Sequence, residues 1–167
     1  MHRQNVAERR LMAETIGVLD EDLLKELQAA GYRADTIVLA ELAPHVQVAW
    51  ADGSVSGRER ALMFEAAAHR GVLPYSPARA QLHRWLGQRP SDHFFRTSRQ
   101  AIRRMLGRLP AHIRIHVRRT LIQECTAVAT ASGGVLGWGT VSEAERRVID
   151  AFRAELDTDE PAGIPGY

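Results

Sequence analysis

Apolar residues recur every three to four positions along most of the chain, which is the spacing of one face of an α-helix. The pattern predicts helices at about residues 20–30, 34–51, 56–71 and 142–156, and three more that begin near Ser76, Ser91 and Pro110. Pro44 lacks a backbone N–H and would clash with the preceding turn, so we expect it to kink or divide segment 34–51. The pattern favours an all-α fold, a compact bundle of helices.

Two periodicities compete directly after Pro110. Residues 112–117 alternate between apolar and polar side chains as a strand would, whereas apolar residues from Ile113 to Val128 recur at helical spacing. We predict a helix, because the helical pattern is longer and no partner strand is visible elsewhere in the chain.

One sequence element occurs twice. Residues 48–59, VAWADGSVSGRE, lead an alanine-lined helix end into a glycine and then into a Ser-x-x-Glu capping box at Ser56 and Glu59. Residues 128–133, VATASG, and 140–145, TVSEAE, repeat this order with Ser142 and Glu145. We therefore expect an internally duplicated helix-turn-helix element.

The first copy, AxADGxVSxxE at residues 49–59, resembles a motif of the TerB-like domains, which occur in tellurite-resistance TerB proteins and at the cytoplasmic head of DjlA-type co-chaperones. The resemblance spans roughly residues 15–156. It implies an all-α fold of about seven or eight helices, no established catalytic chemistry and a link to stress and tellurite response. It also implies binding of a divalent cation by the acidic residues of the motif, here Asp52 and Glu59.

The second copy departs from this pattern. Ser132 stands where the family pattern has an aspartate, and nine positions separate Gly133 from Ser142, against three between Gly53 and Ser56. These departures argue against a site that has one metal ion in each copy.

Two interpretations of Asp52 remain open. Asp52 follows a predicted helix end, where unpaired carbonyls and the helix dipole disfavour a carboxylate unless a cation compensates. In the alternative, Asp52 folds back on the amides of the turn and Glu59 only completes the cap of its own helix. Two carboxylates fall short of the six to eight oxygen ligands that calcium takes, and the turn is not an EF-hand loop.

Charge is unevenly distributed, although the net charge is only +2. Eleven arginines occur from Arg79 to Arg119 with a single acid, Asp92, whereas residues 143–160 are predominantly acidic. The basic region could bind nucleic acid or an anionic surface through a helix face, for which the candidate residues are Arg99, Arg103, Arg104 and Arg118. Alternatively, it is a solvated face that is neutralised by the acidic C-terminal helix and tail.

Length and composition are those of one globular domain. We assign residues 1–156 to a single TerB-like helical domain and expect the polar, proline-bearing residues 157–167 to form a flexible tail. No stretch approaches the roughly 18 apolar residues of a membrane span, and the N-terminus lacks the apolar core of a signal peptide. With a single cysteine, Cys125, these features indicate the cytoplasm.

No nucleophile, base and orienting group stand together in the sequence, so we do not predict an enzyme. The leading hypothesis is a non-catalytic stress-response module that interacts with a protein partner or with itself and binds a divalent cation. The alternatives are a nucleic-acid or anionic-surface binder and an oligomeric helical scaffold. No other cofactor is expected.

Overall fold

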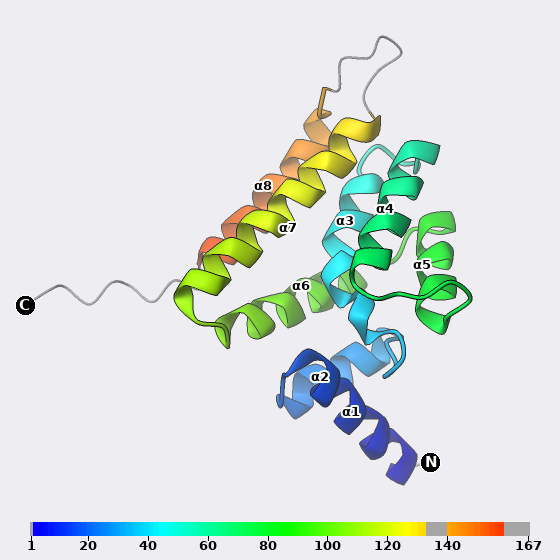
Figure 1. Cartoon of the computed structure of the whole chain (residues 1–167), viewed down its shortest axis with the longest axis vertical. Coiled ribbons are helices and arrows are strands. Elements are labelled where there is room, and N and C mark those ends of the chain that lie inside the picture. The colour runs from blue at the N-terminus through cyan, green and yellow to red at the C-terminus, as the bar shows by residue number, and fades with distance from the viewer. Residues whose placement is uncertain (1, 133–139, 159–167) are drawn as a thin grey trace, which may run out of the picture.

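A computed structural model describes residues 2–132 and 140–158 (Figure 1). These residues form eight α-helices and one 3-10 helix and contain no strand, which confirms the predicted all-α class and number of helices. The elements are α1 (His2–Ile16), α2 (Glu21–Ala29), η1 (Ile37–Leu42), α3 (Ala43–Ala49), α4 (Gly57–His69), α5 (Pro77–Gly87), α6 (Asp92–Gly107), α7 (Ala111–Ser132) and α8 (Glu143–Asp157). No helix among the described residues is long and apolar enough to cross a membrane.

Side-chain caps fix where most of the predicted helices begin. Asp20, Ser76 and Ser91 each accept hydrogen bonds from amides in the first turn of α2, α5 and α6. Pro44 divides the segment 34–51 as expected, because η1 ends at Leu42 and Pro44 lies in the first turn of α3, where its missing N–H is not needed. The helix predicted after Pro110 is also confirmed, as α7 is continuous through residues 112–117.

Helix α1 is not among the predicted elements. Its buried apolar residues, Met12, Ala13 and Ile16, lie in its last turns, and most of the helix before them is exposed. An amphipathic pattern confined to the last turns is too short to identify a helix from sequence.

Helix α3 lies at the centre of the fold. It packs against η1, α4, α6, α7 and α8, and six of its seven residues are buried. A helix that is buried on every side has no solvent-facing stripe, which explains its nearly continuous apolar sequence. Helices α7 and α8 lie side by side as a hairpin along one flank of α3, α4 packs against both α3 and α7, and α5 packs on α4 at the far side of the molecule from α8 (Figure 1).

The core includes Cys125 on α7, which is fully buried. Burial raises the pKa of its thiol, so Cys125 behaves as a small apolar side chain rather than as a nucleophile.

Two segments lie outside the described residues. These are the glycine-rich residues 133–139 and residues 159–167 of the predicted tail. At the start of that tail, Asp157 is still the last residue of α8 and Thr158 is its C-cap.

Candidate functional site

The two copies of the sequence repeat form matching helix starts. At α4, the Ser56 N–H donates to Glu59 Oε2 at 2.6 Å, and the Glu59 N–H donates to Ser56 Oγ at 3.2 Å. At α8, the corresponding bonds between Ser142 and Glu145 are 2.7 and 3.1 Å long. Both predicted capping boxes are therefore present with nearly the same geometry.

A tight turn carries the chain from α3 into the first capping box. Gly53 adopts a φ of 89°, in the left-handed region that favours glycine, and its N–H donates to the carbonyl of Trp50, the C-cap of α3. This geometry explains the Asp-Gly pair of the motif, because a side chain at position 53 would strain the backbone.

Asp52 connects the two copies. Its Oδ1 accepts a hydrogen bond of 2.8 Å from the hydroxyl of Ser142, the cap of α8. Ser142 thus bonds simultaneously to the first-turn amide of α8 and to the turn before α4. Neither interpretation of the sequence anticipated this contact, in which the carboxylate binds a hydroxyl of the other copy.

Three carboxylates, those of Asp52, Glu59 and Glu145, lie close together where the two copies meet. Glu59 and Glu145 are each only 1% exposed, although both carry an ionisable group. Burial raises the pKa of Glu59, the hydrogen bonds from Ser56 oppose that shift, and the nearby charges of Glu145 and Asp52 add to it. The surroundings of Glu59 therefore favour its protonated form over its charged form. We call Asp52, Glu59, Ser142 and Glu145 the acidic junction.

The acidic junction is not a complete metal cage. In the part of the chain that the structure describes, no group of three His, Cys, Asp or Glu side chains lies at metal-ligand spacing. Two of the carboxylates already accept backbone amides. Asp52 is the exposed member, and among the described residues its carboxylate bonds to the Ser142 hydroxyl and to no backbone amide, so it is the carboxylate best placed to reach a hydrated ion.

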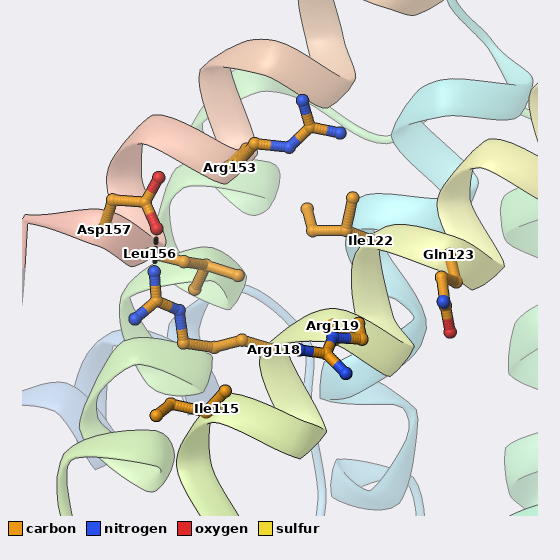
Figure 2. Close-up of a pocket in the computed structure, with 8 residues that line it drawn as sticks. All are labelled: Ile115, Arg118, Arg119, Ile122, Gln123, Arg153, Leu156 and Asp157. Carbon is orange, nitrogen blue, oxygen red and sulfur yellow. Dashed lines mark ion pairs between the residues drawn. The ribbon is translucent and has the colours of Figure 1, made fainter. Parts of the chain in front are cut away.

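The four predicted basic-face residues do not share one surface. Arg99 is largely buried and donates to Glu155 Oε2 at 2.7 Å and to Gln47 Oε1 at 2.6 Å. Arg118 forms an ion pair with Asp157 at the end of α8 (Figure 2). For these two arginines, the interpretation in which the acidic C-terminal helix neutralises the basic region accounts for the contacts.

Arg103 and Arg104 lie elsewhere, in a pocket of about 810 Å³ between the start of α2 and the α6–α7 connection. Arg108 and Arg114 also line it, and the one acid among its described lining residues, Asp20, lies 3.5 Å from Arg104. Arg108 and Arg114 were not among the candidates. The short turn between α6 and α7 brings them beside Arg103 and Arg104, an arrangement that helical periodicity within one helix does not reveal.

A cluster of polar side chains that the sequence did not predict links several elements of the bundle. Glu124 of α7 accepts 2.6 Å from Arg70 Nη2 and lies 3.1 Å from Nε2 of the fully buried His45 on α3. Arg70 also pairs with Glu41 at 3.2 Å. The hydrogen bond with His45 first, and then the one with Arg70, lower the pKa of Glu124 to about 2. No sequence signal paired these residues, because they come from η1, α3, α7 and the C-cap of α4.

Comparison of the chain with known proteins identified no relative. No family model matches the chain, and it has no significant match to a curated protein or to a solved structure. The resemblance to TerB-like domains accordingly rests on the residues of the repeated motif.

Proposed function

We propose that the protein is a non-catalytic, TerB-like interaction module of a stress response, and that its acidic junction binds a divalent cation. The observation that supports this proposal best is the hydrogen bond between Asp52 and Ser142, which places the acidic turn of one copy on the capping box of the other. The cation would bind where both copies meet, so one ion would serve the duplicated element.

Three properties of the acidic junction support a cation. Asp52 follows the C-cap of α3, where the helix dipole and unpaired carbonyls are negative. Two further carboxylates, Glu59 and Glu145, are buried beside it. The available ligands are oxygens, and few of them are uncommitted, which suits a hard ion that retains several waters, as Mg²⁺ does.

Thermal unfolding with Mg²⁺, Ca²⁺, Mn²⁺ or Zn²⁺ tests the cation. An ion that binds only the folded state stabilises it by about 1.4 kcal/mol at ten times its Kd, which for a chain of this size raises the Tm by roughly 3–5 °C. Asp52→Asn should lose most of this shift. Asp35→Asn is the matched control, because Asp35 is an exposed aspartate in a different part of the chain. The absence of a shift with every ion, or an equal shift in Asp52→Asn, would refute cation binding.

The arginine-lined pocket supports a second candidate function, binding of nucleic acid or of an anionic surface. Among the described residues that line it, four arginines face a single acid. Binding to DNA or to anionic vesicles should weaken steeply with added salt, and should weaken further in Arg108→Glu and Arg114→Glu. No retention on either material at low salt would exclude this function.

A further inference from the structure

A groove of about 560 Å³ runs between the start of α7 and the end of α8 (Figure 2). Its apolar lining consists of Ile115 and Ile122 from α7 and Leu156 from α8, and its basic lining of Arg118, Arg119 and Arg153. The positions from Ile115 to Ile122 cover about two helical turns, or roughly 10 Å. The groove is therefore long enough for a short helical segment.

The apolar part of this groove is partly open to solvent. Ile115 is 50% exposed, although isoleucine is among the residues most often buried. Figure 2 shows Ile122 facing the groove from α7 and Arg153 extending over it from α8. Aliphatic side chains in a concave setting are typical of a surface that a partner covers.

The charge of the groove identifies the complementary partner. Arg118 is already paired with Asp157, and Arg153 lies 3.5 Å from the exposed Asp150. Arg119 is exposed and forms no ion pair with any residue that the structure describes. The groove thus retains basic groups that can pair with carboxylates, and the Arg118–Asp157 pair shows that a carboxylate fits there.

We propose that this groove docks an acidic, amphipathic segment of a partner protein. Its apolar side chains would pack on Ile115 and Ile122, and its carboxylates would pair with Arg119 and Arg153, which is the helix-in-groove mode of recognition. The inference rests on the interaction-module part of the proposed function and not on the cation. Among the described residues that line the groove, none is an aromatic side chain on which a base could stack, and its apolar residues line a concavity, so a peptide fits better than nucleic acid or a membrane.

Fluorescence anisotropy with the whole protein tests the proposal. The probe is a labelled peptide of about four helical turns with Leu at every third or fourth position and Glu at most others, and its counterpart has Lys in place of Glu. We expect the acidic peptide to bind, with an affinity that falls with salt, and the Lys peptide not to bind. Arg119→Glu with Arg153→Glu, and separately Ile115→Ser, should weaken binding at least about tenfold.

Two further variants make the result specific. Asp157→Asn should bind the acidic peptide about threefold or more tightly, because Arg118 is then released to pair with the peptide. Arg10→Glu is the matched control, since Arg10 is a strongly exposed arginine on α1 and should leave binding unchanged. The substituted residues at the groove are exposed or partly exposed, and thermal unfolding of each variant checks that it remains folded.

Several outcomes would overturn the proposal. These are no binding of the acidic peptide, equal binding of the Lys peptide, and no effect of the Arg119 and Arg153 substitutions. A dimer in solution that dissociates in the Arg119/Arg153 variant would show that a second copy of this chain occupies the groove. If the peptide does not bind, the proposed cation binding is unaffected. Ser142 of the acidic junction and Arg153 of the groove lie toward opposite ends of α8, and the cation titration of Asp52→Asn measures the acidic junction alone.

Discussion

The carboxylate of Asp52 accepts a hydrogen bond of 2.8 Å from the hydroxyl of Ser142, 90 positions later in the chain. Ser142 is also the N-cap of α8, so one hydroxyl joins the start of that helix to the turn between α3 and α4. The Asp52–Ser142 hydrogen bond therefore joins the turn of the first copy to the N-cap of the second copy.

This contact predicts that Asp52 and Ser142 are energetically coupled. Ser142→Ala removes a cap and the cross-copy bond and should lower the free energy of unfolding by about 1–2 kcal/mol. In the Asp52→Ala background the same substitution should cost less, by roughly 0.5 kcal/mol, since the shared bond is already absent. Urea unfolding of the four proteins measures this difference.

Ser56 provides the internal control for that cycle. Ser56 caps α4 with the same geometry. Ser56→Ala and Asp52→Ala should therefore be additive. Equal coupling in the two cycles would show that the Asp52–Ser142 bond contributes nothing of its own.

Glu59 should make the protein less stable as the pH rises. Because its pKa is raised in the folded state, the folded protein holds that proton more tightly than the unfolded chain does. This stabilising contribution is complete below the unfolded pKa of about 4.5 and is lost as the pH rises through the raised pKa. The stability of the wild type relative to Glu59→Gln should fall over this range.

Urea unfolding across the pH range tests this expectation for Glu59. Glutamine retains the capping hydrogen bond, which limits the comparison to the charge. Glu65→Gln, at an exposed position on the same helix, is the control. A difference between wild type and Glu59→Gln that does not vary with pH would contradict the assignment.

Glu124 should have the opposite effect. Its pKa is lowered to about 2 by hydrogen bonds with His45 and Arg70, so it stabilises the fold above the unfolded pKa of about 4.5. That contribution is lost as the pH falls through about 2. Glu124→Gln should lower the free energy of unfolding at neutral pH by about 2 kcal/mol and reduce the loss of stability in acid.

Acid titration monitored by circular dichroism checks the second part of this prediction. If wild type and Glu124→Gln lose stability in parallel between pH 4.5 and 2, the network of Glu124 does not contribute to acid stability.

Arg99 should act on stability rather than on binding. Its side chain is only 15% exposed and is held by Glu155 and Gln47, so Arg99→Ala leaves a partly buried carboxylate unpaired. We expect a loss of about 1–2 kcal/mol in the free energy of unfolding. Arg96→Ala, at an exposed position one turn earlier on α6, should change it by less than about 0.5 kcal/mol.

The salt-dependent retention described for the arginine-lined pocket gives a second measurement for Arg99. The Arg99→Ala protein should be retained on DNA or on anionic vesicles as strongly as the wild type. A selective loss of retention with unchanged stability would return Arg99 to the binding surface.

Local interactions explain what could be predicted from the sequence. The caps at Ser56 and Ser142 bond to residues three positions away, and Pro44 acts on the turn that contains it. Such contacts depend on neighbours in the chain, and they determined the helix starts, the division of segment 34–51 and the duplicated element. They also placed Asp52 and Glu59 beside one turn, which is half of the acidic junction.

Tertiary packing decided everything that depends on partners far apart in the chain. The bond of Asp52 to Ser142, the pairing of Arg99 with Glu155 and the bonds of Glu124 to His45 and Arg70 span between 54 and 90 positions. The spacing of arginines suggested one basic face, but the packing of α6 and α7 against α8 divided them between ion pairs, a pocket and a groove. Periodicity tells which side of a helix a residue occupies, whereas the element that covers that side is determined only when the helices pack.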